Sequence, residues 1–406
     1  MLLIHTPGWT EILSQHRDWS PANFSLHYAG NKSWPVREIA EQLHCYPRAE
    51  HKLCDLHMQG MIYLRESLEQ ASGYATATYR ARRWPASTVA DITGGLGVDT
   101  AAWARSGATV CYFEKNTGLA EIATHNHQIL GLDKRIHHTS DDGLARLSSM
   151  MKKNERKPIC DLIYADPSRR SRGTRVVTPD ESDPPVLMYL DLIRSAGKRY
   201  LVKLSPMMDV NLVERDFTGC RQIIAVSVEG EVKELLVDAD GYHEDRCGQN
   251  GPVREAVLLD GRGDERFRVT DQRARPVADI KLPGNWLYEP DPALLKMRLV
   301  DQIAMQFGLS RLSRNAGYLT GSHLLTGFPG KVFKVEEALP FKPRKVKSWL
   351  KNQGYGRVHI HQRGFPLTVN QLYSKLNLKM GEDAHLFAVS GHRDQLLLLV
   401  TRPEKR

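Results

Sequence analysis

The stretch DLIYADPSRR places an acid and a proline directly after an apolar run. Residues 162–165 are typical of a buried strand, and Asp166 and Pro167 follow where it ends. A carboxylate at such a strand end can orient an acceptor or take its proton, so Asp166 and Pro167 are candidate catalytic residues. Arginines, whose guanidinium forks match phosphate groups, follow closely: Arg169, Arg170, Arg172 and Arg175. We expect Asp166 and Pro167 to form a corner at which the reaction occurs, with the arginines in contact with phosphate. The alternative is that the arginines belong to a solvated loop.

A second stretch, ADITGGLGVDT, has the pattern of a tight turn between a strand and a helix. Glycines permit positive φ and allow a ligand to approach the backbone closely. The dinucleotide fingerprint G-x-G-x-x-G is incomplete, because Gly95 and Gly97 are followed by Val98, Asp99 and Thr100. No G-K-[ST] follows either, so the loop does not predict pyrophosphate binding. The alternative is a plain turn with helix-capping acids.

These stretches belong to a chain that alternates strand and helix patterns from about residue 87. The segments STVADI, ATVCYFE, RIHHTSDD, CDLIYAD and RYLVKLS are strand candidates, and a hairpin pattern surrounds Gly230. Near-continuous apolar strands separated by helices predict a doubly wound, mainly parallel α/β sheet. Such sheets bind ligands at the carboxyl ends of their strands. Before this region, residues 36–43 and 53–68 have helical spacing, which predicts a helical N-terminal region.

The loop resembles motif I of class I S-adenosylmethionine-dependent methyltransferases, whose seven-stranded sheet the chain should then share. This cofactor has no phosphate, so the loop needs only to pass beneath its amino-acid part. Asp91 or Asp99 can meet its ammonium group, Glu114 its ribose hydroxyls, and an acid near Asp141 or Asp142 its adenine. Glu69 and Gln70 could close over it, or simply end a helix. The expected cofactor-binding residues are Asp91, Thr93, Gly94, Gly95, Gly97, Asp99, Glu114, Asn116, Asp141, Asp142, Glu69 and Gln70.

The acceptor corner departs from the motifs of better-known relatives. Enzymes that methylate amino groups carry [DNS]-P-P-[YFW], whereas this chain has Ser168 and Arg169 after Pro167. Uracil-C5 enzymes carry D-P-P-R but also need a cysteine after the fifth strand, where this chain reads KLSPMMD. We therefore expect direct methyl transfer without a covalent cysteine intermediate. Lys203 and Ser205 are expected on the far wall of the site.

Most of the chain resembles bacterial class I methyltransferases with a C-terminal THUMP-like domain. The resemblance covers residues from about 60 onward and includes EQASGYATATYRARR, YADPSRR, VEGEVKELL, LYEPDPALLK and GRVHIHQRGFPL. It implies a small ferredoxin-like domain before the THUMP-like one. We predict a helical region at 1–85, a methyltransferase domain at 86–275, a ferredoxin-like domain at 276–325 and a basic THUMP-like domain at 326–406.

Positive charge is concentrated in the last part of the chain. Residues 326–406 contain 15 Lys and Arg against 6 Asp and Glu; since the net charge of the whole chain is +9, the first 325 residues are neutral overall. A basic module suggests a nucleic-acid partner, RNA or DNA, and its interleaved aromatic residues favour RNA, either ribosomal or transfer RNA. The alternative is that Trp349 belongs to the core and the lysines only keep the surface solvated. The expected contacts are Lys342, Arg344, Lys345, Lys347, Trp349, Lys351, Arg357 and Arg363. His359 and His361 lack an evident third ligand, so no metal is expected.

Other features exclude further classes of protein. The six cysteines form no C-x-x-C pair, which argues against a zinc or disulfide framework and favours a reducing compartment. The apolar runs are too short to span a bilayer. We expect a cytoplasmic S-adenosylmethionine-dependent methyltransferase that acts on RNA, with no membrane partner and with its oligomeric state undefined. The alternatives are methylation of a small molecule or a protein, and a non-catalytic RNA-binding protein.

Overall fold

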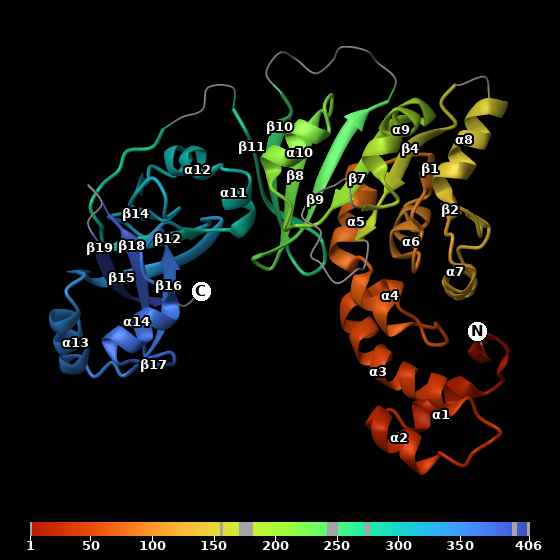
Figure 1. The fold of residues 1–406 in the computed structure, drawn as a ribbon, viewed down its shortest axis with the longest axis horizontal. Helices are drawn as coiled ribbons and strands as arrows, with labels where there is room; N and C mark the ends of the chain where they lie inside the picture. Colours follow the sequence, from red (N-terminus) through yellow and green to blue (C-terminus); the bar gives the residue numbers. More distant parts are fainter. Residues whose placement is uncertain are drawn as a thin grey trace. The chain divides into compact units, whose positions relative to one another are not determined.

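The computed structural model describes residues 2–154, 157–169, 182–241, 251–272, 277–391 and 396–403 (Figure 1). It divides into two compact units. Unit 1 comprises Met1–Glu229, Lys233–Val253 and Leu259–Arg266. Unit 2 comprises Gly230–Val232, Arg254–Leu258 and Phe267–Arg406. Each unit is described by itself below.

Unit 1 begins with a helical region, as the sequence predicts. Its helices are α1 (Trp9–Gln15), α2 (Pro21–His27), α3 (Val36–Leu53), α4 (Arg65–Gln70) and α5 (Tyr74–Arg83), with short 3-10 turns at Leu2–His5 and Cys54–Leu56. In Figure 1 the red and orange α1, α2 and α3 form a group of their own, without strands.

The helix predicted over residues 53–68 is wrong. The chain turns at Cys54, whose φ is 45°, and runs without regular secondary structure through residues 61–64 before α4 begins. Side chains satisfy the backbone here: Ile62 N donates to Asn126 Oδ1 at 2.8 Å, and Tyr63 N donates to Gln42 Oε1 at 2.9 Å. These partners are distant in sequence, so the local apolar spacing could not reveal them.

A largely parallel sheet forms the centre of unit 1. Its strands are β1 (Thr88–Asp91), β2 (Thr109–Phe113), β3 (Ile136–Thr139), β4 (Cys160–Ala165), β7 (Gly197–Leu204), β8 (Gln222–Val228) and β9 (Glu231–Asp240). Their order is β3-β2-β1-β4-β7-β9-β8. Neighbours from β3 to β7 pair in parallel, whereas β7 and β9 pair antiparallel. The prediction of a doubly wound, mainly parallel α/β sheet is confirmed. The number of strands differs from the expected seven, because two further strands, Val253–Leu259 and Glu265–Thr270, continue the sheet beyond β8 and bring it to nine.

Helices follow the strands along the chain and fix the loops between them. They are α6 (Val98–Arg105), α7 (Thr117–Ile129), α8 (Gly143–Lys153), the turn Val186–Tyr189 with α9 (Leu190–Ala196), and α10 (Val210–Asp216). The strand side chains they cover are deeply buried; Ile163, Tyr200 and Val237 are fully inaccessible. Because β1, β2, β3, β4 and β7 run parallel, their carboxyl ends meet along one edge.

Unit 2 is an α+β structure. The strands β10 (Val253–Leu259) and β11 (Glu265–Thr270) are divided between the units, and β12 (Trp286–Pro290), α11 (Pro292–Lys296), α12 (Val300–Gln306), β13 (Ser310–Arg311) and β14 (Leu319–Gly321) follow. The rest is β15 (Gly330–Pro340), α13 (Pro343–Asn352), β16 (Arg357–Arg363), α14 (Val369–Leu376), β17 (Lys379–Met380), β18 (Ala384–Ser390) and β19 (Leu396–Pro403).

Strands from both predicted C-terminal domains form one sheet, in the order β13-β14-β12-β15-β19-β18-β16-β17. The contact between the two segments is the antiparallel pairing of β12 with β15, in which Leu287 lies opposite Phe333. One face of the sheet packs its apolar side chains against α13 and α14, through Val346, Leu350 and Leu372. The boundary between residues 325 and 326 stays a prediction.

Across the described ranges, every helix is too short or too polar to cross a bilayer.

Candidate active site

The glycine-rich loop after β1 is built for close approach to its backbone. Gly95 and Gly97 have φ of 53° and 80°, a region that side chains with a Cβ rarely adopt. Gly94 N donates to Phe113 O at 2.8 Å, and a Cβ on Gly94 would lie 2.2 Å from the Tyr112 ring. The loop therefore lies tightly against β2, with its other side open to a pocket.

Glu114 follows β2 and faces this loop. Its carboxylate accepts hydrogen bonds from Gly95 N at 2.9 Å and from Asn116 N at 2.7 Å. Asn116 caps α7 by accepting from Leu119 N at 3.1 Å. The loop thus holds the carboxylate at the edge of the pocket, where it could accept hydrogen bonds from a pair of ligand hydroxyls.

A pocket of about 780 Å³ lies at the carboxyl ends of the strands. This is within the range of small-molecule sites. Most of the residues predicted to bind a cofactor line it: Glu69, Gln70, Thr93, Gly94, Gly95, Gly97, Asp99, Glu114, Asn116 and Asp142. Asp142 also caps α8 by accepting from Ala145 N at 2.8 Å.

Two predicted cofactor ligands do not line this pocket, Asp91 and Asp141. Asp91 is 1% exposed and lies beneath the loop, where it accepts from Thr100 Oγ1 at 2.6 Å and from Thr93 N at 3.2 Å. Burial raises the pKa of Asp91 to about 7. Asp91 therefore supports the loop from below and does not face the ligand as expected. Asp141 accepts a hydrogen bond from Asp142 N at 2.9 Å.

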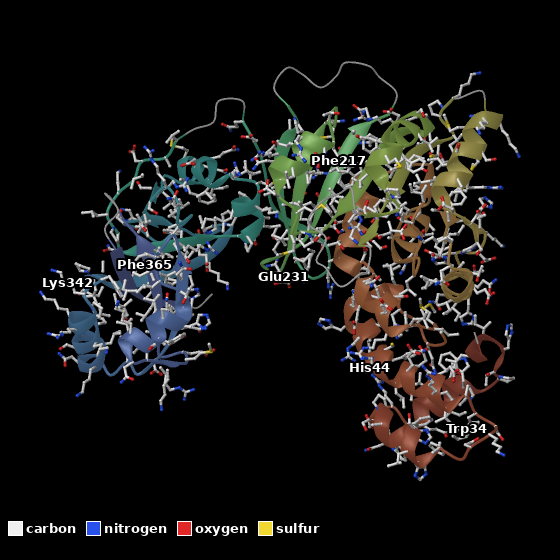
Figure 2. All side chains as sticks on the ribbon, viewed as in Figure 1. Trp34, His44, Phe217, Glu231, Lys342 and Phe365 are labelled. Carbon is white, nitrogen blue, oxygen red and sulfur yellow. The ribbon has the colours of Figure 1, made fainter. Side chains whose placement is uncertain are left out.

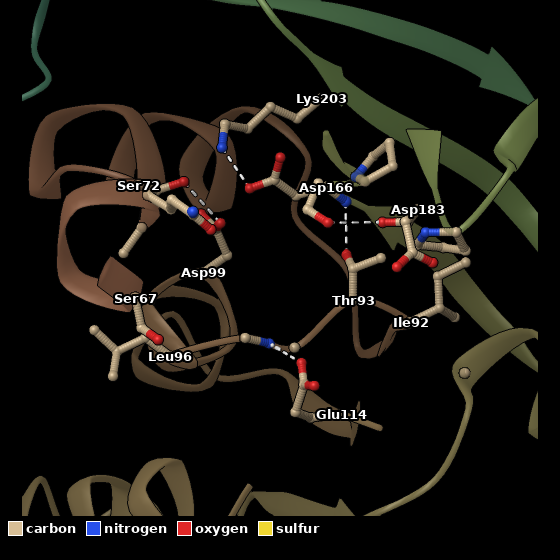
Figure 3. A pocket seen from close by; sticks show the side chains of 18 of the residues that line it. Ser67, Ser72, Ile92, Thr93, Leu96, Asp99, Glu114, Asp166, Asp183 and Lys203 are labelled. Carbon is tan, nitrogen blue, oxygen red and sulfur yellow. Dashed lines mark hydrogen bonds and ion pairs between the residues drawn. The ribbon is translucent and has the colours of Figure 1, made fainter. Parts of the chain in front are cut away.

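The predicted reacting corner opens into the same pocket. Asp166, Pro167, Lys203 and Ser205 all line it, and the Lys203 ammonium donates to Asp166 Oδ2 (Figure 3). The Asp166 backbone N–H donates to Thr93 Oγ1 at 2.6 Å, which ties the corner to the loop. In Figure 3, Asp166 and Lys203 lie toward one end of the pocket and Glu114 toward the other. A ligand held at Glu114 and the loop would therefore extend toward the Asp166 carboxylate.

Behind the pocket lies a buried ion cluster that the sequence patterns do not predict. Arg80, on α5, is fully buried and pairs with both Asp99 and Glu234. Asp99 Oδ2 also accepts from Ser72 Oγ at 2.8 Å and from Tyr164 Oη at 3.0 Å. Burial acts to raise the pKa of Asp99, but Arg80 and Lys203 outweigh it and hold that pKa below its usual value. Asp99 is thus an ionised anchor for Arg80, and its oxygens are already occupied.

The arginine run after Pro167 is described only at its start. Ser168 and Arg169 form the short strand β5, which pairs with β6 (Ser182–Asp183). The Arg169 side chain and the predicted phosphate contacts Arg170, Arg172 and Arg175 lie outside the described residues. From residue 182 onward the structure again describes the chain, and Asp183 pairs there with Lys115 at 2.5 Å. Both residues line the pocket, and they are too distant in sequence for the contact to be predicted.

His127 supports the loop from α7. Its Nε2 hydrogen-bonds to Gly97 O at 2.9 Å and its Nδ1 to His138 Nε2 at 2.8 Å. The carbonyl can only accept, so Nε2 of His127 donates to it and Nδ1 accepts from His138. Burial lowers the pKa of His127 to about 4, so the ring is neutral at physiological pH.

Because His127 is buried in its neutral form, we predict that the free energy of unfolding falls in mild acid. Between pH 6.5 and 4 the unfolded chain binds a proton that folded His127 rejects, so stability falls as the pH falls. At pH 5 the loss relative to pH 7 is about 2 kcal/mol. Urea unfolding of His127→Gln should show a correspondingly flatter pH dependence over this window. His137→Gln, on the exposed side of β3, should leave the dependence unchanged; equal slopes for wild type and His127→Gln would contradict the assignment.

The basic residues predicted on unit 2 differ in their accessibility. Those exposed to solvent are Lys342, Arg344, Lys345, Lys347, Lys351 and Arg357. Lys342, labelled in Figure 2, precedes α13 at the start of this basic segment. Trp349 packs partly into the core beneath α13. Arg363 is half-buried, pairs with Glu289 at 2.9 Å and lies over the Tyr318 ring at 4.8 Å, so its expected role as a free nucleic-acid contact is corrected to a structural one.

His359 and His361 lie on β16 beside His385 of β18. His361 Nε2 hydrogen-bonds to His385 Nδ1 at 2.9 Å, and the His361 ring stacks on Phe387. In the part of the chain that the structure describes, no group of three or more histidines, cysteines or acids could hold a metal ion.

Comparisons with known proteins agree with this geometry. Residues 330–403 match the family model described as THUMP domain-like. Two relatives from strains of Mycobacterium tuberculosis, named uncharacterised S-adenosylmethionine-dependent methyltransferases, are 26% identical over 324 residues, covering 78% of this chain and 81% of theirs. A crystal structure from Porphyromonas gingivalis W83, whose description names a methyltransferase, is similar with a TM-score of 0.82 and 25% identity, covering 99% of this chain and 98% of that one. The chain is a class I, S-adenosylmethionine-dependent methyltransferase with a THUMP-like domain at its C-terminus.

Proposed function

We propose that this methyltransferase modifies RNA by direct methyl transfer at the Asp166 corner. The observation that carries the proposal is that the glycine loop, Glu114 and the Asp166–Lys203 pair all line one pocket. When bound, S-adenosylmethionine supplies a methyl group activated by its sulfonium. The chain's own contribution is to hold cofactor and acceptor in contact, since positioning alone removes a large part of such a barrier.

For the cofactor, we propose that Glu114 accepts the ribose hydroxyls and that Gly94, Gly95 and Gly97 pass beneath the amino-acid part. We propose further that Asp142, which lines the same pocket, accepts from the adenine amino group. Glu69 and Gln70 of α4 form the N-terminal wall of the pocket. We propose that Asp99 acts by holding Arg80 rather than by meeting the ligand, because its carboxylate is buried and already accepts from Arg80, Ser72 and Tyr164.

A test of the cofactor assignment is Glu114→Gln. Loss of the charge weakens two hydrogen bonds from ligand hydroxyls, and bonds to charged groups contribute roughly 1.5–3 kcal/mol each. We expect the affinity for S-adenosylhomocysteine, measured by calorimetry, to fall on the order of 10–100-fold. Glu121→Gln, at an exposed position of α7, should bind as wild type. Undiminished binding by Glu114→Gln would place the ribose elsewhere.

For the acceptor, we propose that Asp166 orients the reacting group, with Pro167 and Ser205 beside it. Ser205 occupies the position where an enzyme working through a covalent cysteine adduct would need its thiol, so transfer is direct. Arg169, Arg170, Arg172 and Arg175 leave this corner along the chain, and we propose that they contact phosphate.

RNA as the substrate is supported by the THUMP-like match and by the exposed cations around α13. The contacts we propose are Lys342, Arg344, Lys345, Lys347, Lys351 and Arg357. Binding through phosphates releases counterions, so affinity should fall steeply with salt. We also propose that the protein acts in the cytoplasm.

Charge reversal on α13 tests the RNA surface. In filter binding to total RNA, Lys345→Glu combined with Lys347→Glu should weaken binding about tenfold or more and reduce the salt slope by roughly two. A matched reversal outside unit 2, Lys152→Glu with Lys153→Glu on exposed turns of α8, should change little. Equal salt slopes for the α13 variant and wild type would remove α13 from the interface.

The reaction itself is tested with labelled S-adenosylmethionine and total RNA from cells that lack the protein. We expect label in that RNA and little in RNA from normal cells, whose sites are already modified. Label in protein or in small molecules instead would show that the acceptor is not RNA. Absence of transfer to any acceptor would favour a non-catalytic protein that only binds RNA.

A further inference from the structure

The Asp166–Lys203 pair leaves each partner with free hydrogen-bonding capacity toward the pocket. Lys203 donates to Asp166 Oδ2, while Oδ1 has no hydrogen-bond partner in the described ranges. The Lys203 ammonium has three N–H donors, and Asp166 is its one hydrogen-bond partner among the residues described. The side chains are 28% and 14% exposed, so both are partly shielded from water and reach the pocket surface. An acceptor group can therefore meet an empty carboxylate oxygen and a cation together.

The cation at this corner is permanent. Burial acts to lower the pKa of Lys203, but Asp166 and Asp99 outweigh it, and the pKa is held above its ordinary value. The ammonium therefore stays charged across the physiological range and cannot serve as a base. A fixed cation stabilises negative charge that develops beside it and opposes positive charge.

This charge arrangement separates the two main classes of acceptor atom. A nitrogen acceptor gains positive charge as it takes a methyl cation, which Lys203 would oppose. A hydroxyl acceptor loses its proton, and its oxygen gains negative charge, which Lys203 would stabilise while Asp166 Oδ1 receives the proton. The chain also has Arg169 where amino-methylating enzymes place an aromatic ring to stack on a base, and Ser168 in place of their second proline. Both observations favour oxygen.

We infer that the atom methylated is a hydroxyl oxygen of RNA, the ribose 2′-OH. This inference rests on the proposed function, because it assumes that the acceptor is RNA; the 2′-OH is then the hydroxyl that every internal nucleotide carries and that distinguishes RNA from DNA. The oxygen forms the new O–CH3 bond as the S–CH3 bond of the sulfonium breaks, with the sulfur keeping the bonding electron pair. The hydroxyl proton passes to Asp166 Oδ1 and then to solvent, and Lys203 stays protonated throughout.

Alkaline hydrolysis of the methylated RNA tests this inference. The wild-type protein is incubated with labelled S-adenosylmethionine and total RNA from cells that lack it, and the RNA is then hydrolysed in alkali. A 2′-O-methyl group blocks cleavage of the adjacent phosphodiester, so we expect the label in alkali-stable dinucleotides. Label in mononucleotides would place the methyl group on a base, which overturns this inference and leaves RNA methylation standing. No label in RNA would overturn the proposed function, and this inference with it.

Substitution of Lys203 tests the role of the cation. Lys203→Met should lower the rate of transfer at saturating cofactor on the order of 10²–10³-fold, and Lys203→Arg, which keeps the charge, should recover much of it. Lys198→Met is the matched control, because Lys198 lies on the same strand and pairs with Asp161 at 2.8 Å away from the pocket. A folded Lys203→Met variant with the wild-type rate, or no recovery by Lys203→Arg, would remove the cation from the reaction.

Discussion

Replacement of Arg80 by methionine is expected to lower the free energy of unfolding by about 3–5 kcal/mol. The Arg80 side chain is fully buried and pairs with Asp99 and Glu234, whose side chains are 10% and 1% exposed. Methionine leaves two carboxylates in the interior without their shared cation, and burial already raises the pKa of Glu234. Urea unfolding followed by circular dichroism measures the loss.

A neighbouring arginine provides the control for this experiment. Arg82 lies on the same helix and pairs with Asp264 at 2.7 Å, but the two side chains are 49% and 61% exposed. Exposed pairs contribute less than about 1 kcal/mol, so Arg82→Met should unfold near the wild-type midpoint. Equal losses of unfolding free energy for Arg80→Met and Arg82→Met would show that the buried ion cluster contributes no more to stability than the exposed pair.

Asp166→Asn is expected to lower the rate of methyl transfer by roughly 10²–10⁴-fold, the usual contribution of a positioned acid–base group. The amide has nearly the shape of the carboxylate but is a far weaker acceptor for a proton, and it no longer balances the Lys203 charge. Affinity for S-adenosylhomocysteine should change much less, because Glu114 lies toward the other end of the pocket (Figure 3). Single-turnover transfer into RNA and calorimetry measure the two effects.

The same pair of strands carries a matched control for Asp166. Asp161 lies at the opposite end of β4 and pairs with Lys198 of β7 at 2.8 Å, outside the pocket lining. Asp161→Asn removes an acid–lysine pair from the same two strands without touching the site, so its rate should match wild type. Equal rate losses in both variants would assign the effect of Asp166→Asn to the sheet rather than to the reacting corner.

Features that depend on local sequence could be predicted. Parallel strands that end on acids bring those acids to one edge of the sheet, so strand order alone predicts that Glu114, Asp142 and Asp166 share a site, and all three line the pocket. The glycines of the loop predict a turn with positive φ in the same way, and Gly95 and Gly97 have φ of 53° and 80°. Asp91 looks equivalent in sequence, but its side chain is buried beneath the glycine loop and accepts a hydrogen bond from Thr100 of α6, which depends on packing.

Features that depend on distant partners could not be predicted. Arg80 and Glu234 are 154 positions apart, and only the fold brings them together. A signal did exist, because Glu234 precedes the apolar LLV of β9, where a buried charge needs a partner. Arg363 shows the converse: it has the pattern of an exposed basic residue until the pairing of β12 with β15 brings Glu289 into the same sheet.

Calorimetric titration of the purified chain with S-adenosylmethionine tests whether the cofactor occupies this pocket, on which all of the proposed chemistry depends. We predict saturable binding at one site per chain that is weakened by Glu114→Gln and unaffected by Glu121→Gln. Absence of binding, both for the chain alone and after addition of RNA from cells that lack the protein, would contradict it.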